Sequence, residues 1–596
     1  MCYQCRARSQ WITAYHSAIL ILSGCPSLRL AMIVPSIIVM TSFCFIYIFV
    51  VQAIINMANP RLTKSNSTPL FLPFVSLFLL LNLSGMGFFR WFYAVNRNHN
   101  FVDFVSVIGK DETTNWLHPI LQYILSYRSS PFILHISSSI ILLFMSEERC
   151  FKKKRSHSED ISNNNNQNDS NKKQSLPEYD NNNSIFDSEN ISAKPTDEFN
   201  ENRYQIKQVQ KQNEYSLIGT LLGLTVPLQH QGFFSIGMYV ILYIIVEFVY
   251  SHIAKAVNKN KVNISLIFSN LNIPSIKLFF INFGNSCKAD FIDTFFSPAI
   301  QKMIVCFAII SSVSLIQYRK TGMDLDWIHR EVLWSDNIKQ GSFFPSIVQW
   351  YSNLGLYPLF VLIFVWFFLD VLHIKFLLPT VPIFIIGNYI SFQSVSKYNF
   401  LFFYPTWGLV SSIFVPIALQ KLTNLNFVKT EENKKNKSVN EEIQGVFLGF
   451  SILFLLSCTL SSLMGINRQW KKKSPLWGDA EDNVADYIIH NTKKNDVFLT
   501  TEGSYDPVSL LAGRTSFKMS NFHLFAHNKV WFLYNDDIQK LRQNPNLGIL
   551  PMITFYLEHS RRDNDMHLKK PDMNQSWSLC FRYESYNLYN RTIHEK

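Results

Sequence analysis

"LAMIVPSIIVMTSFCFIYIFVVQAII" occupies residues 30–55 and contains no charged side chain. A hydrocarbon core of ~30 Å requires about 20 consecutive apolar residues in helical form, and this run is longer than that. It is also too long for the apolar part of a cleavable signal peptide. The run therefore predicts a membrane anchor, and similar runs recur along most of the chain.

The composition agrees with a membrane protein. Of the 596 residues, 48% are hydrophobic and only 16% are charged, whereas soluble domains carry about 25% charged residues. The net charge is +12, but the basic residues flank apolar runs or lie in Asn-rich linkers. Nucleic-acid binding needs them on one folded face, so we interpret them as topology signals and predict no nucleic-acid partner.

The nine cysteines are scattered. Cys2 and Cys5 form a single C-x-x-C pair at the amino terminus. A closed zinc site needs four ligands, so this pair alone does not predict one.

The apolar runs predict an α-helical polytopic membrane protein with about ten spans. We expect these spans at 30–55, 69–89, 129–146, 215–231, 234–255, within 264–317, and at 352–371, 375–392, 401–421 and 443–464. Two segments of the 264–317 region are candidates. We take "AIQKMIVCFAIISSVSLI" (299–316) as the span and "LIFSNLNIPSIKLFFINF" (266–283) as interfacial.

Lysine-rich linkers predict the orientation. With this span count, "ERCFKKKRSH" (148–157), "KAVNKNK" (255–261) and "KTEENKKNK" (429–437) fall on one side of the membrane. Positively charged loops mark the cytosolic side. The loops at 90–128, 318–350 and 393–400, and the tail, are then lumenal or extracellular. Sequons at Asn574 and Asn590 agree with a lumenal tail, and we expect the endoplasmic reticulum membrane.

The chain divides into four parts. Residues 1–146 form an amino-terminal region of about three spans, and 215–465 form a core of about seven. Between them, 147–214 is Asn-rich and lacks the apolar content for a core, which predicts a disordered cytosolic loop. We expect residues 466–596 to form a small lumenal α/β domain, because this part of the chain has the sequence pattern of a soluble domain.

The tail contains recognisable elements. "AEDNVADYIIHNT" (480–492) has helical spacing, "DVFLTT" (496–501) is typical of a buried strand, and "ILPMITFYL" (549–557) of a second. "DPVSLLAGR" (506–514) begins a helix that Gly513 ends, with Arg514 holding a helix end or reaching an acid. "SWSLCFRYESYNLYN" (576–590) predicts a hairpin.

Five stretches together resemble a known group of proteins. They are "LLNLSGMGFFRWFYAV" (80–95), "WLHPILQYILSYRSSPF" (116–132), "GTLLGLTVPLQHQGFFSIG" (219–237), "WYSNLGLYPLF" (350–360) and "ADYIIHNTKKNDVFLTTEGSYDPVSLLAGR" (485–514). Their order resembles a poorly characterised family of multispanning proteins that are similar to GT-C glycosyltransferases. The resemblance implies a transferase that moves a sugar from a polyprenyl-phosphate donor to a lumenal acceptor.

The chain also departs from that group. The GT-C class carries an acidic motif after its first span, and no Asp-Asp or Glu-Asp pair precedes Ser84. If the resemblance holds, we expect an amino-terminal part to be missing or replaced relative to the family. A catalytically inactive family member with a structural role therefore stays an alternative.

Sugar transfer to a hydroxyl needs a base and a group that stabilises the leaving phosphate. "GMDLDWIHREVLWSDN" (322–337) contains Asp324 and Asp326, whose carboxylates suit Mg²⁺ or Mn²⁺, and Arg330 for substrate binding. The alternative is a solvated loop. The 90–128 loop adds Asp103, which lies between apolar neighbours and is a second candidate base, and His118 as a binding residue.

Two residues at predicted span ends are further candidates for donor binding. Arg128 stands at the head of a span, where a guanidinium binds phosphate oxygens or extends toward the membrane surface. His230 lies between two helices and either lines a cavity or stabilises the turn.

A transporter or channel is the competing class. Such proteins show internal repeats and charges within spans. We find no two-fold repeat, and Asp370 and Lys375 are placed at span ends.

Overall fold

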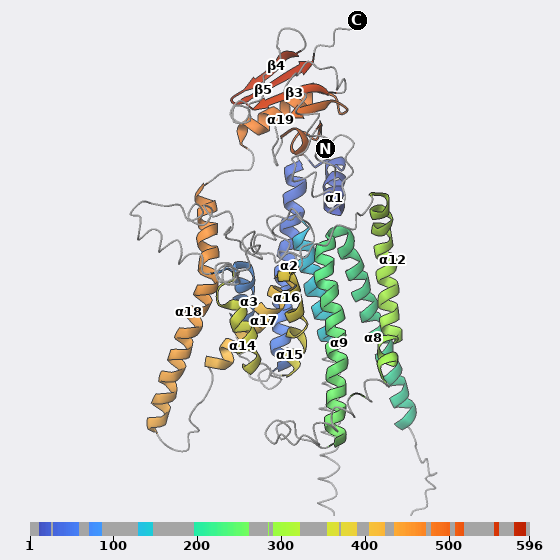
Figure 1. Cartoon of the computed structure of the whole chain (residues 1–596), viewed down its shortest axis with the longest axis vertical. Coiled ribbons are helices and arrows are strands. Elements are labelled where there is room, and N and C mark those ends of the chain that lie inside the picture. The colour runs from blue at the N-terminus through green and yellow to red at the C-terminus, as the bar shows by residue number, and fades with distance from the viewer. Residues whose placement is uncertain are drawn as a thin grey trace, which may run out of the picture.

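The structure is a computed structural model. It describes residues 11–25, 28–58, 71–85, 129–146, 196–260, 284, 290–321, 354–368, 371–389, 404–423, 434–472, 478–500, 507–517, 553–559 and 577–591. The described chain is mostly helical, and a small β-sheet domain lies at one end of the long axis (Figure 1). We call that end of the helices the sheet side and the opposite end the linker side.

Helices occur wherever the apolar runs predicted a span. They are α1 (Trp11–Leu22), α2 (Leu28–Ala58), α3 (Phe71–Asn82), a helix at Ser130–Ser146, α8 (Thr196–Leu228), α9 (His230–Asn260), α12 (Pro298–Thr321), α14 (Tyr357–Phe368), α15 (Val371–Leu377), α16 (Thr380–Tyr389), α17 (Tyr404–Thr423) and α18 (Lys434–Lys472). The expected span 375–392 is interrupted by a turn at Leu378 and Pro379, which separates α15 from α16. The sequence analysis did not anticipate α1.

Three of these helices are long and apolar enough to cross a membrane. They are Leu30–Asn56 in α2, Gly232–Ile253 in α9 and Glu442–Met464 in α18. Their outward faces are apolar: Ile38 is 62% exposed and Leu453 is 69% exposed. Soluble monomers rarely expose contiguous apolar surface on this scale, so these faces suit contact with lipid.

Helix α17 lies at the centre of the helical region. All of its side chains from Tyr404 to Leu419 are buried. Its hydroxyl groups bond to neighbouring helices: the Tyr47 hydroxyl lies 2.6 Å from Ser412 Oγ, and Tyr357 donates to Ser411 Oγ at 3.0 Å. Packing around α17 therefore combines an apolar core with hydrogen bonds between hydroxyl groups, whereas the buried Trp407 Nε1 has no hydrogen-bond partner among the described residues.

Helices α8 and α12 pack side by side in a parallel direction. The contacts are made at Gly219 and Gly223, which belong to a G-x-x-x-G pattern. A Cβ on Gly219 would collide with the Met303 backbone, and one on Gly223 would lie 2.8 Å from the Ile310 Cβ. Glycines at this spacing let two helix backbones approach closely, as is common between membrane helices.

Part of the segment predicted to be a disordered loop is helical. Residues 147–195 lie outside the described residues, but 196–214 are helical and form the first part of α8. This segment is rich in Glu, Gln and Lys, which favour helix, and it continues into an apolar helix that nucleates it. The absence of a core pattern thus did not imply the absence of a helix.

The carboxy-terminal domain is built on a mixed five-stranded sheet. Its strands are β1 (Val497–Thr500), β2 (Thr515–Ser516), β3 (Ile553–His559), β4 (Trp577–Tyr583) and β5 (Tyr586–Arg591), in the order β2-β1-β3-β5-β4. β1 is parallel to β2 and β3, whereas β5 is antiparallel to β3 and β4. The two predicted strands and the closing hairpin are confirmed.

Both faces of the sheet bury apolar side chains. Helix α19 (Asp479–Asn491) packs on one face through Val484 and Ile488, and Tyr556 and Trp577 belong to the cluster on the other face. These two clusters are separate from the core of the helical region. The domain therefore has its own hydrophobic core.

Glycine and arginine shape the turn after the predicted helix, which forms as α20 (Pro507–Leu510). Gly513 has φ +63°, the left-handed conformation that ends helices. The next residue, Arg514, is 8% exposed and donates to the Ile489 and Thr492 carbonyls at 2.9 and 3.1 Å. Arg514 thus holds the end of α19, one of the two roles that the sequence left open.

Candidate functional site

Most predicted site residues lie outside the described residues. These are Asp103, His118, Arg128, Asp324, Asp326 and Arg330. His230 is the first residue of α9, at the turn after α8, and only its backbone is described. Within the described ranges, no group of three His, Cys, Asp or Glu side chains is placed to hold a metal ion. The Mg²⁺ or Mn²⁺ expected at Asp324 and Asp326 stays a prediction.

The described helix ends that flank the acidic segments lie at the sheet side. The α8–α9 turn is on this side in Figure 1. α12 runs parallel to α8, since Lys302 bonds to Gln212 and Ile310 packs on Gly223, so α12 ends on the same side at Thr321. α14 begins there too: Tyr357 contacts Trp407, whose neighbour Thr406 bonds to Ser235 near the start of α9.

The 90–128 segment is also bounded by sheet-side helix ends. After α3, Asn82 and Ser84 contact Ser462 in the last third of α18, the part that leads to the sheet domain. The helix Ser130–Ser146 runs toward the linker side, because its last residue, Ser146, donates to Glu214 near the middle of α8, well below the sheet-side end of α8 at Leu228. Its first residue therefore points to the sheet side.

A second polar cluster lies nearer the linker side. Glu247, in the apolar part of α9, forms an ion pair with Lys375 of α15. The Lys375 side chain is only 4% exposed, whereas Glu247 is 36% exposed. The Lys375 ammonium also lies 4.7 Å from the centre of the Tyr250 ring, a cation–π contact that stabilises a desolvated charge. The pair joins two helices that are far apart in the sequence.

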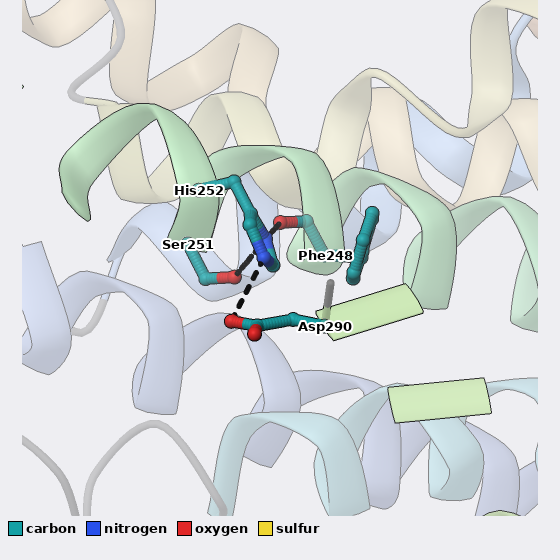
Figure 2. Close-up of polar contacts among 4 residues, drawn as sticks. All are labelled: Phe248, Ser251, His252 and Asp290. Carbon is teal, nitrogen blue, oxygen red and sulfur yellow. Dashed lines mark hydrogen bonds and ion pairs between the residues drawn. The ribbon is translucent and has the colours of Figure 1, made fainter. Parts of the chain in front are cut away.

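A third polar cluster surrounds His252, which follows Glu247 on α9 (Figure 2). His252 Nδ1 lies 2.8 Å from the Phe248 carbonyl and 3.2 Å from Ser251 Oγ, and Nε2 lies 3.2 Å from Asp290 Oδ2. The imidazole is 2% exposed, while Asp290 is 38% exposed. The contact attaches the residues before α12 to the end of α9.

His252 contacts acceptors through both ring nitrogens: the Phe248 carbonyl at Nδ1 and the Asp290 carboxylate at Nε2. The Ser251 hydroxyl already donates to the Phe248 carbonyl at 2.8 Å. Ser251 donates away from His252, so the three residues do not form a nucleophilic triad.

Sequence reasoning missed Glu247 and His252, and it placed Lys375 at a span end. An ionisable residue within an apolar run is a signal of a functional or paired position, and "YIIVEFVYSHIAK" (243–255) contains that signal. The partner could not be read from the sequence, because Lys375 lies on another helix and Asp290 on another segment.

The sheet domain buries one carboxylate in a polar network. Glu558 of β3 is 2% exposed and accepts hydrogen bonds from Asn587 at 2.9 Å and from the Tyr589 hydroxyl at 2.8 Å. A buried carboxylate is stable only with such donors. Both donors come from the neighbouring strand β5, so this network fixes the pairing of two strands and has no arrangement typical of catalysis.

No protein-family model matches this chain, and no curated protein matches it.

Proposed function

We propose that this chain is a multi-pass membrane glycosyltransferase, similar to the GT-C class, with about ten spans. It transfers a hexose from a polyprenyl-phosphate donor to an acceptor on the sheet side of the membrane. That side is the lumen of the endoplasmic reticulum in this proposal, and the lysine-rich linkers are cytosolic.

The observation that supports the proposal is the sidedness of the helix ends. The described ends flanking 90–128 and 322–353 point to the sheet side. The start of α8, the end of α9 and the start of α18, which adjoin the lysine-rich linkers, lie at the opposite end (Figure 1). The helix ends that flank the acid-bearing segments thus lie on the same side as the folded tail, and the helix ends beside the lysine-rich linkers lie on the other, which supports a lumenal transferase.

In the proposed reaction, Asp324, Asp326 or Asp103 takes the proton of the acceptor hydroxyl. Arg128, Arg330, His118 and His230 bind the donor, whose phosphate leaves with the lipid. Carboxylates suit the role of the base, and guanidinium and imidazole groups suit the binding of the phosphate.

Profiling of lipid-linked sugars tests the proposal. Cells that lack the protein should accumulate the unused donor, and wild-type protein should restore the pool. D324A should fail to restore it, whereas D486A, which alters an exposed acid on α19, should succeed. Unchanged donor pools and unchanged glycans in the null cells would contradict a transferase.

The Glu247–Lys375 pair favours a second candidate, an ion-coupled transporter. Charges buried within spans often lie on proton or ion pathways, and Lys375, which the sequence placed at a span end, is buried beside Glu247. In liposomes containing the purified protein, transport would appear as a change of internal pH that E247Q abolishes. No pH change above protein-free liposomes would exclude this candidate.

A further inference from the structure

The helix Ser130–Ser146 begins with two buried hydroxyl groups. The side chains of Ser129 and Ser130 are both 0% exposed, and neither Oγ has a hydrogen-bond partner among the described parts of the chain. The Ile133 amide donates to the Ser129 carbonyl at 3.1 Å, which makes Ser129 the N-cap residue. Both hydroxyls therefore lie at the amino-terminal end of a long helix.

The hydroxyl of Ser129 is not used as a cap. An N-cap serine usually accepts a hydrogen bond from the second or third amide of the helix. The second helical residue here is Pro131, which has no amide hydrogen. Most other buried hydroxyls of the helical region bond to a carbonyl or to another hydroxyl, as Ser137 does with Ile133 and Ser84 with Cys458. A pair of unused donors at one helix end is thus an exception.

This end of the helix suits an anion. Of the first three helical residues, Ser130 and Phe132 carry amide hydrogens without an intrahelical acceptor, and the helix dipole favours negative charge there. The two serine hydroxyls at this end add two donors. Phosphate oxygens accept several such bonds at once, and charge-assisted bonds are the strong ones. The site has no carboxylate among its described residues that would repel an anion.

We propose that Ser129 and Ser130, with the first-turn amides, bind the phosphate group of a polyprenyl phosphate. This inference rests on the proposed function, because it identifies where the lipid phosphate of the donor is held. The helix starts at the sheet side of the helical region, where the transferase would bind its donor. The apolar outward faces of the neighbouring helices suit the lipid chain.

Ligand protection of the full-length protein in detergent tests the site. The probes are geranylgeranyl phosphate, its alcohol geranylgeraniol, and inorganic phosphate. We expect geranylgeranyl phosphate to raise the unfolding temperature of the wild type, and the other two probes to have little effect. In S129A/S130A the apparent affinity should fall about a hundredfold, since two charge-assisted hydrogen bonds are lost.

Ser138 provides the matched control. It lies on the same helix, is also 0% exposed and also has an unpartnered Oγ, but it is far from the helix end. S138A should bind geranylgeranyl phosphate as the wild type does. If the double variant does not purify as a monodisperse protein, S129A and S130A are measured separately, each with a smaller loss.

Two results would overturn the site. One is equal protection of the wild type and S129A/S130A, and the other is absence of protection in both. Equal protection by inorganic phosphate would overturn the assignment to a lipid. These outcomes differ from failure of the proposed function, which would appear as unchanged lipid-linked sugars in null cells while geranylgeranyl phosphate still protects the protein.

Discussion

The helical region and the sheet domain place their large apolar side chains in opposite positions. On α2, α9 and α18, large apolar side chains such as Phe49 (64% exposed) and Ile241 (59%) point outward, and serine, threonine and charged groups lie inside. In the described part of the sheet domain, only Ile489 and Leu579 are large apolar residues with comparable exposure. Its apolar side chains lie on the two buried faces of the sheet instead.

The difference is the one expected if the helical region contacts lipid and the sheet domain contacts water. Lipid imposes no cost on an exposed Phe, and it makes an unpaired polar group expensive. Water does the reverse. The helical region accordingly depends on polar contacts and close helix packing in its interior, whereas the sheet domain depends on apolar burial on both faces of the sheet and on hydrogen bonds such as those of Glu558 and Arg514.

The largest expected effect is loss of the Glu247 carboxylate. E247A should destabilise the protein by about 3–5 kcal/mol, because a buried Lys375 ammonium loses its counter-charge. The double variant E247L/K375M should recover most of this loss. Thermal unfolding in detergent measures both, with E442A on the exposed part of α18 as control. Equal stability of E247A and E442A would contradict an interior charge pair that stabilises the helices.

Alanine substitutions at two glycines compare a packed helix face with an open one. G219A should cost about 1–3 kcal/mol, because the added methyl collides with the Met303 backbone. The matched variant G445A places a methyl in open space on α18 and should be neutral or stabilising by about 1 kcal/mol. The unfolding temperatures of the two variants in detergent should differ in that order. The reverse order would mean that α8 and α12 do not pack at Gly219.

In the sheet domain, R514L should cost about 2–3 kcal/mol, since the carbonyls at the end of α19 lose a charged donor. Because this core is separate from that of the helices, the damage should be confined to the domain. Limited proteolysis should cut residues 478–591 faster while the helical region stays intact. The exposed Arg582 serves as control through R582L. Simultaneous loss of both regions would show that their stability is coupled.

The smallest expected effect is a pH dependence at Glu481. Burial raises the pKa of this carboxyl, but hydrogen bonds from the Gly478 amide and the Tyr586 hydroxyl, both 2.8 Å long, outweigh burial, so the pKa lies below its ordinary value. A lowered folded pKa contributes stability above the ordinary pKa, and that stability is lost as the pH falls through the folded pKa. Circular dichroism of the domain's unfolding at several acidic pH values should show a decline that E481Q reduces. An identical decline in E481Q would assign it to other groups.

The sequence predicted the elements well where one physical signal dominates. Long apolar runs located the helices, and Gly513 located the end of a helix because its positive φ requires glycine. It could not predict the pairing of Glu247 with Lys375 or the bonds of Arg514 to α19, since these join residues that only the fold brings together. The start of α8 was missed because helix propensity without apolar periodicity resembles a linker. Of the candidate site, only the flanking helix ends are described, so its residues remain predictions.

Enclosure of α17 has a consequence for biogenesis. This helix is not among those apolar enough to enter a bilayer alone, and its buried Thr406, Ser411 and Ser412 need partners. The partners described for them are Ser235, Tyr357 and Tyr47, all of which are synthesised earlier. The residues that bond to the hydroxyl groups of α17 are thus translated before α17 itself, so these contacts can form as soon as the helix is synthesised.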